Sequence, residues 1–355
     1  MDRSNLVKSL PDIVRDAKIE AEIYPNQTKN IFYISTRSVR KKRIEELWVR
    51  DRELGRGGYG IVHLERCKTD GRTKVRAVKQ IRKAAVPGQE FDYLRELEAV
   101  MKFSHPKYQH CFVRSDGWYE SHDCIFIVME YLEHGDLQKH LKQPLQEREA
   151  RLITSQVLEG LRFMHENGFT HRDLKPANIM VVNKGPRWFV KIADFGISKR
   201  RHESSMSLQT PQRGTVGFAA PEVFGVGNAK GSYTSVVDMW SLGAVVYTMF
   251  TRTTPFPTVG DVCRYARGEI GFPLEKLKQC RITQHCQQFI MSLMVPDARQ
   301  RLSSSKADKH PWMTIESSLM GSNGSNMRRS YSFRGRERSK RENVIEKVLS
   351  KQKHR

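Results

Sequence analysis

The octapeptide His171-Arg172-Asp173-Leu174-Lys175-Pro176-Ala177-Asn178 places a carboxylate, an amine and an amide within six positions of one another. Asp173 can accept a proton from a hydroxyl group, Lys175 can neutralise a phosphoryl group in transfer, and Asn178 can ligate a divalent metal ion. Phosphoryl transfer depends on such positioning and charge neutralisation more than on covalent help from the protein. The octapeptide therefore predicts a catalytic loop.

Two motifs follow it at fixed distances. Asp194-Phe195-Gly196 begins 21 residues after Asp173 and supplies a second carboxylate for a metal ion, with a flexible glycine. Ala220-Pro221-Glu222 follows after that. Each motif alone can arise by chance, but their order along the chain is characteristic.

A glycine-rich segment, Gly55-Arg56-Gly57-Gly58-Tyr59-Gly60-Ile61-Val62, precedes them. Glycines let the backbone pass close to phosphates and present N–H groups to them. The spacing serves dinucleotide folds and nucleotide-binding hairpins, and ordinary hairpins also contain it. Because a second strand follows directly, where a dinucleotide fold has a helix, we expect a strand–loop–strand hairpin.

Lys79 lies 19 residues past Gly60, at the end of Val75-Arg76-Ala77-Val78-Lys79. A lysine in an alternating strand is ordinarily a solvated surface residue. On the strand after a glycine hairpin, however, its ammonium can reach the phosphates of a nucleotide held under the loop. We therefore interpret Lys79 as a nucleotide-binding residue.

The remaining pattern predicts a strand-rich region followed by a helical one. Period-two alternation predicts strands over 48–54, 61–66 and 73–81, and a short apolar run predicts a buried strand over 125–129. Helices are expected over 90–103, 150–167, 236–251 and 282–294, with Gly168 ending the second. In the first 45 residues we expect a helix over 6–22 and a short strand over 31–34.

Together these motifs resemble the eukaryotic-type protein kinases, from about residue 48 to residue 312. The resemblance implies an α+β, bilobal kinase fold, with a small β-rich N-lobe and hinge over 46–132 and a larger helical C-lobe over 133–315. Residues 1–45 would then form an N-terminal extension, and residues 316–355 a basic, flexible tail.

The resemblance also implies the site. Lys79 would pair with Glu96, although Glu90, Asp92 and Glu98 are also present in or near that helix. Asn178 and Asp194 would hold Mg²⁺, with Mn²⁺ as an alternative. The implied ATP contacts are Gly55, Arg56, Gly57, Gly58, Tyr59, Gly60, Val62, Ala77, Lys79, Met129, Glu130, Leu132 and Asp136. Scaffold roles are implied for Asp238, which would brace the catalytic loop, and for a buried Glu222–Arg301 ion pair.

Lys175 and Pro176 in the catalytic loop resemble the serine/threonine branch, which phosphorylates hydroxyl groups of protein substrates. Met129-Glu130-Tyr131-Leu132 and Lys309-His310-Pro311-Trp312 resemble the calcium/calmodulin-dependent group, including checkpoint-type kinases. Ala177 and Thr248 depart from the acidic residues by which basophilic members recognise arginine. An arginine-directed consensus therefore stays open.

The expected activation segment spans 194–222 and contains several hydroxyl residues. Thr210 is the favoured site for phosphorylation by an upstream kinase, and Ser207 is the next. Thr215 is expected to contact Asp173 and Lys175. The alternative is a serine-rich loop that is not modified.

The net charge of +22 first suggests nucleic-acid binding. Residues 326–355 alone contribute +8 of it, and no helix-turn-helix, zinc or RNA-binding motif is recognisable, so we expect no sequence-specific nucleic-acid binding. The basic tail has an apolar stripe of Val344, Ile345, Val348 and Leu349, which suits calmodulin or an anionic surface. It can equally be a solvated or an inhibitory segment.

The composition argues against a membrane protein, a secreted protein and a protein with disulfides or a zinc site. No stretch reaches the roughly 20 apolar residues of a membrane helix, and the first residues do not resemble a secretory signal. Six scattered cysteines without a C-x-x-C pair favour a reducing compartment, cytoplasmic or nuclear, over disulfides or a zinc site. The rival interpretations are a pseudokinase scaffold, which binds nucleotide without transferring phosphate, and a basic nucleic-acid-binding protein.

Overall fold

The computed structural model describes residues 11–34, 42–57, 60–69, 71–83, 93–194, 216–226 and 235–314. Met1–Ala307 forms one compact unit and Asp308–Arg355 a second. In the described part of the second unit, the Trp312 backbone N–H donates to His310 Nδ1 at 3.2 Å.

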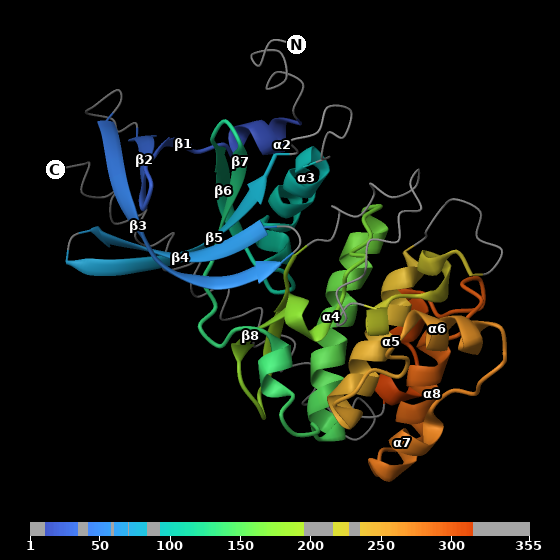
Figure 1. Ribbon diagram of the computed structural model, residues 1–355. Coiled ribbons are helices and arrows are strands. Elements are labelled where there is room, and N and C mark those ends of the chain that lie inside the picture. Colours follow the sequence, from blue (N-terminus) through green and yellow to red (C-terminus); the bar gives the residue numbers. More distant parts are fainter. Residues whose placement is uncertain are drawn as a thin grey trace. The chain divides into compact units, whose positions relative to one another are not determined.

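A seven-stranded antiparallel sheet forms the small lobe, in the order β1-β2-β3-β4-β5-β7-β6 (Figure 1). Its strands are β1 (Glu20–Ile23), β2 (Gln27–Ile34), β3 (Lys42–Gly57), β4 (Gly60–Thr69), β5 (Arg72–Arg82), β6 (Ser115–Glu120) and β7 (Cys124–Met129). The four strands expected after residue 46 are confirmed as β3, β4, β5 and β7. β6 was not expected, because Asp116 and Gly117 interrupt its apolar alternation.

Near the N-terminus, the predicted helix over 6–22 is largely wrong. Within the described residues only α2 (Asp12–Asp16) is helical, and the chain then enters β1. Ile19, Ala21 and Ile23 alternate with polar residues, and all three pack against the core of the sheet. In so short a stretch the hydrophobic pattern fits both the 3.6-residue period of a helix and the two-residue period of a strand. The pairing of β1 with β2 decides between them. The strand expected over 31–34 is confirmed as the end of β2.

One core cluster of the small lobe lies on the inner face of the sheet, the face that Val78 and Val128 share and that is opposite Lys79, and helix α3 (Tyr93–Phe103) adds a separate buried surface. Val78, Tyr119, Cys124, Phe126 and Val128 form one buried cluster, in which the rings of Tyr119 and Phe126 stack 4.8 Å apart. From the described side chains of α3, five are fully or nearly fully buried: Leu97, Ala99, Val100, Met101 and Phe103. The helix is thereby fixed through one apolar face.

The large lobe is mainly helical. Its helices are α4 (Glu147–Glu166), α5 (Val236–Thr251), α6 (Val259–Ala266), α7 (Leu274–Gln279), α8 (Gln284–Leu293) and α9 (Ser304–Ala307). Every residue of α5 from Val237 to Phe250 is buried, and α4 and α8 pack against it. Short 3-10 turns are η1 (Pro106–Tyr108), η2 (Leu137–His140), η3 (Pro176–Asn178), η5 (Val216–Phe218) and η6 (Pro221–Phe224). The three helices expected here are confirmed within a few residues, and Gly168 follows the α4 C-cap with φ +75°.

A two-stranded sheet, β8 (Ile179–Asn183) and β9 (Phe189–Ile192), lies against α4. Gly160 of α4 allows the close approach, because a Cβ there would lie 2.7 Å from Ile192 Cδ1. Asn178 directly precedes β8 and Asp194 follows β9, and because the two strands are antiparallel with Ile179 opposite Ile192, both residues lie at the same end of the hairpin. This packing therefore positions both expected metal ligands.

Candidate active site

The structure brings the three predicted residues of the catalytic loop together, between α4 and β8. Lys175 Nζ lies 2.9 Å from Asp173 Oδ2. Asn178 Nδ2 donates to the Asp173 carbonyl at 2.7 Å and to its Oδ2 at 3.3 Å. Asp173 is only 7% exposed, so its carboxylate is held by these neighbours rather than by bulk water.

Asp238, which is fully buried on α5, anchors this loop. Its carboxylate accepts the backbone N–H groups of His171 and Arg172, both at 2.8 Å, and lies 2.9 Å from His165 Nε2. Arg172 has φ +67°, a conformation that costs a non-glycine residue about 1–3 kcal/mol. The buried carboxylate holds the backbone in this strained shape.

Asp194 is tied to the same loop through the backbone. The Ala193 N–H donates to the Asn178 carbonyl at 2.9 Å, and His171 Nε2 lies 3.0 Å from the Ala193 carbonyl oxygen. Asp194 itself has φ +58°. Backbone strain of this kind concentrates at functional sites.

Lys79 reaches the site from β5 and forms an ion pair with Asp194. Burial alone would raise the pKa of Asp194, but the Lys79 ammonium outweighs it and holds the pKa below its usual value. Asp194 is therefore ionised at neutral pH, and so carries the charge that a metal ligand needs.

The expected nucleotide contacts on the sheet share one face. Val62 lies opposite Lys79, and Ala77 lies opposite Met129, so their side chains lie on the same side. Gly60 has φ +138°, and a Cβ there would lie 2.0 Å from a backbone oxygen, so this position needs glycine. Gly55 and Gly57 border open space.

The hinge after β7 presents mainly its backbone, because its acidic side chains have other partners. The Glu130 carboxylate accepts the Arg114 N–H at 2.8 Å and pairs with Lys191 Nζ at 2.5 Å. The Asp136 carboxylate caps η2 by accepting the Lys139 N–H at 3.1 Å. The reading of an adenine edge by N–H and C=O groups of the hinge stays a prediction.

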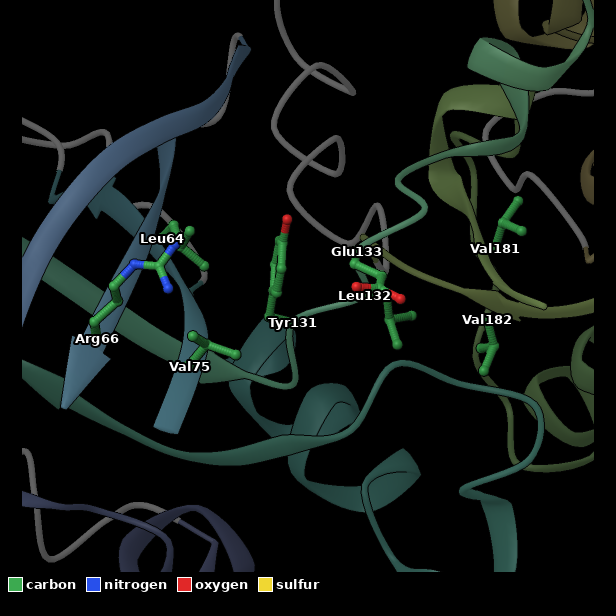
Figure 2. A pocket seen from close by; sticks show the side chains of 8 residues that line it. All are labelled: Leu64, Arg66, Val75, Tyr131, Leu132, Glu133, Val181 and Val182. Carbon is green, nitrogen blue, oxygen red and sulfur yellow. The ribbon is translucent and has the colours of Figure 1, made fainter. Parts of the chain in front are cut away.

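Figure 2 shows a cavity of about 540 Å³ beside the hinge. Its walls come from β4, β5, the hinge and β8: Leu64, Arg66, Val75, Tyr131, Leu132, Glu133, Val181 and Val182. It shares Leu132 with the expected adenine contacts. Its lining includes none of the five charged and amide residues of the site, so it is not the phosphate-binding space; these are Lys79, Asp173, Lys175, Asn178 and Asp194.

The side chains fit a nucleotide with a divalent cation. The described hydrogen bonds of the Asn178 side chain use Nδ2, so the Oδ1 oxygen can serve as a metal ligand. Asp194 adds a carboxylate, and such oxygen ligands are those that Mg²⁺ prefers. Lys79 adds a cation beside them for phosphate groups.

Several predicted residues lie outside the described part of the chain. Residue 96 falls within α3, but the Glu96 side chain is not among the described groups, so its pairing with Lys79 stays a prediction. The same holds for the loop tip and activation segment: Gly58, Tyr59, Ser207, Thr210 and Thr215. The basic tail from residue 315 onward also lies outside.

Two supporting residues have no signal in the sequence. His165 joins Asp238 across 73 positions, and Lys191 joins Glu130 across 61, so no local pattern marks either of them. The expected Glu222–Arg301 ion pair is present, buried and bidentate, at 2.7 and 3.0 Å.

A separate trio, His110, Cys111 and Glu159, brings its potential ligand atoms within 4.8 Å of one another. Burial raises the pKa of the Cys111 thiol far above its usual value. His110 and Glu159 are both more than two-fifths exposed and pair with each other at 3.4 Å, so we assign no metal site there.

Comparison with known proteins places this geometry in a family. The sequence model of the family described as the protein kinase domain matches residues 48–313 of this chain. The chain belongs to the protein kinase family. The bilobal fold and the membership predicted from the motifs are thus confirmed.

Relatives of this kinase domain are named as serine/threonine and calcium/calmodulin-dependent protein kinases, the groups that the motifs resemble. It is 34% identical to the serine/threonine-protein kinase RAD53 of Saccharomyces cerevisiae, over 77% of this chain and 33% of that protein. It is also 34% identical to the calcium/calmodulin-dependent protein kinase cmkA of Emericella nidulans, over 75% and 62%. A crystal structure of Rad53 1–466 in complex with AMP-PNP matches with a TM-score of 0.59 and 34% identity, covering 74% of this chain and 64% of that one.

The chain spans from a third to about three fifths of the length of these relatives. Among the helices that the structure describes, none has the length and apolar character to cross a bilayer.

Proposed function

We propose that this protein is an active serine/threonine protein kinase that transfers the γ-phosphoryl group of ATP to hydroxyl groups of protein substrates. One observation carries the proposal: Asp173, Lys175 and Asn178 are in mutual contact, while Lys79 and Asp194 pair beside them. The AMP-PNP complex of the similar Rad53 structure supports ATP as the donor.

Each residue then has a role in phosphoryl transfer. Asp173 orients the substrate hydroxyl and accepts its proton, and Lys175 neutralises charge on the phosphoryl group during transfer. Lys79 and the backbone of 55–60 fix the nucleotide phosphates. Bound Mg²⁺, or Mn²⁺, supplies further charge neutralisation, and Asn178 and Asp194 hold it.

The decisive experiment compares phosphorylation of the protein itself and of a generic serine/threonine substrate by four chains. These are the wild type, Asp173→Ala, Lys79→Met and the surface control Glu275→Gln. We expect the first two variants to lose activity by about 10²–10⁴-fold, as is typical when a proton-transfer or phosphate-binding group is removed, and the control to match wild type. Equal phosphorylation by all four chains would exclude the proposed roles.

The same assay separates the pseudokinase alternative. A wild-type chain that is thermally stabilised by ATP and Mg²⁺, but transfers no phosphate to any substrate, would be a nucleotide-binding scaffold. The metal requirement follows from measuring phosphorylation with Mg²⁺, with Mn²⁺ in its place, and with EDTA added to remove divalent ions.

Regulation is proposed at two places outside the described residues. Phosphorylation at Thr210, or next at Ser207, would order the activation segment by pairing with Arg172. The basic tail would bind calmodulin, which the name of the cmkA relative supports. Calcium-dependent retention on immobilised calmodulin, lost when residues 326–355 are removed, tests this.

All six cysteines lie in the described part of the chain and none is in a disulfide, which supports a reducing intracellular compartment.

A further inference from the structure

Residues 11–34 contain α2, β1 and β2 and lie before the region matched by the kinase family model, which begins at residue 48. We infer that this segment, here called the N-terminal clasp, is a positioning element for helix α3, the helix in which residue 96 lies. The docking of the clasp on α3 is independent of the proposed kinase activity, and only its effect on turnover rests on that proposal.

The clasp first extends the sheet. β2 pairs with β3 over eight residues, from Gln27 opposite Val49 to Ile34 opposite Lys42, and β1 pairs with β2. The pairing buries Thr28 and Asn30 on the inner face, where Thr28 Oγ1 lies 3.4 Å from the Tyr119 hydroxyl. The clasp is therefore part of the small-lobe core.

The clasp then closes the sheet on its other side, at Trp118 of β6. The Ile19 N–H donates to the Trp118 carbonyl at 2.7 Å, and the Trp118 N–H donates to the Ala17 carbonyl at 3.1 Å. The Trp118 indole Nε1–H donates to the Val14 carbonyl at 2.7 Å. Trp118 is only 1% exposed, so these bonds form in a dry environment where an unmade bond is costly.

Gly117 shows that β6 is adapted to this contact. It has φ +132°, and a Cβ there would lie 2.6 Å from the Ala17 carbonyl oxygen and 3.0 Å from the Ile19 side chain. Only glycine combines this conformation with so close an approach.

The first element of the clasp, α2, packs against α3 (Figure 1). Val14, the middle residue of α2, is fully buried, whereas Ile13 beside it is 43% exposed. Lys18, just after α2, pairs with Glu120 at 2.7 Å, and Glu120 also pairs with Lys83 at the end of β5. The clasp thus contacts α3 and is joined through Glu120 at the end of β6 to Lys83, which directly follows β5.

The placement of this helix matters for catalysis. In protein kinases a carboxylate on the helix must meet the lysine of the neighbouring strand, and helix position controls this. A misplacement of about 1 Å in such a site can lower a rate by about 100-fold. The clasp would therefore set how often Lys79 finds its partner on α3.

The test uses the full chain with Val14→Asp and the matched control Ile13→Asp, which adds the same charge on the exposed face of α2. For Val14→Asp we expect faster hydrogen exchange of α3 amides and of the Trp118 amide, and a red shift in the tryptophan fluorescence, to which Trp118 contributes as one of five tryptophans. We also expect turnover to slow by about 10-fold or more, with KM for the protein substrate unchanged. Ile13→Asp and the conservative Val14→Ile should match wild type. Should Val14→Asp fail to fold, Lys18→Ala removes the partly exposed ion pair with Glu120 and the contact of the Lys18 ammonium with the Trp118 ring, 5.2 Å from its centroid, and should give a smaller change in the same readouts.

The outcomes separate the two proposals. If Trp118 becomes exposed while α3 exchange and turnover stay at wild-type values, the clasp only stabilises the sheet and the positioning role is wrong. If Val14→Asp changes neither fluorescence nor exchange, the docking itself is wrong. Exchange and fluorescence need no catalysis, so they decide the matter even if wild type transfers no phosphate.

Discussion

The catalytic loop at 171–178 and the N-terminal clasp at 11–34 are both fixed by distant parts of the chain, but through different chemistry. In the loop, the Asp238 carboxylate accepts two backbone N–H groups and holds a strained conformation. In the clasp, backbone pairing with β3 and β6 provides the attachment, and side chains contribute mainly apolar contact. The loop therefore depends on residue identity, whereas the clasp depends on shape and register.

Replacing Asp238 should have the largest effect, because three groups lose one acceptor at once. Each buried donor left without a partner costs about 1–3 kcal/mol, so Asp238→Ala should lower the free energy of unfolding by several kcal/mol. Activity should also fall steeply, since Arg172 is no longer held at positive φ. Denaturant unfolding measures the first effect and the turnover rate the second. Glu275→Ala, which removes a carboxylate that is 79% exposed, should change little; equal losses for the two variants would contradict this account.

Gly117→Ala tests the clasp by shape rather than by charge, and its effect should be intermediate. The new methyl group meets the Ala17 carbonyl oxygen, and the backbone conformation adds about 1–3 kcal/mol of strain. We expect a lower unfolding midpoint and faster exchange of the β1 and β6 amides. Gly268→Ala is the matched control, because Gly268 has φ +76° but no neighbouring atom within 4 Å. If both variants lose the same stability, the close approach of the clasp contributes nothing.

The same contrast explains what could be predicted from the sequence. Phosphoryl transfer requires particular residues at fixed local spacing, so Asp173, Lys175 and Asn178 were predicted and are found in contact. The clasp depends on which strands pair, and Val14 and Trp118 meet across 104 positions with no local signal. Gly117 disrupts the alternation of β6 because it accommodates this contact. The feature that makes the docking possible therefore also hides the strand.

The smallest expected effect is a pH dependence at the ion pairs that anchor the clasp. Burial would raise the pKa of Glu120, but hydrogen bonds from Lys18 and Lys83 outweigh it, and the pKa lies below its usual value. Because the folded pKa is the lower one, the contribution of Glu120 to stability is fully present above its unfolded pKa. It is lost as the pH falls through the folded pKa.

Thermal unfolding of wild type and Glu120→Gln from pH 7 down to pH 3 measures this contribution. The midpoints should differ at pH 7 by an amount equivalent to roughly 1 kcal/mol or less, since the pairs are partly exposed, and should converge at the acid end. A constant difference across the range would mean that Glu120 acts through packing and not through its charge. The clasp would then be held by shape alone, which would make its contrast with the carboxylate-anchored catalytic loop sharper.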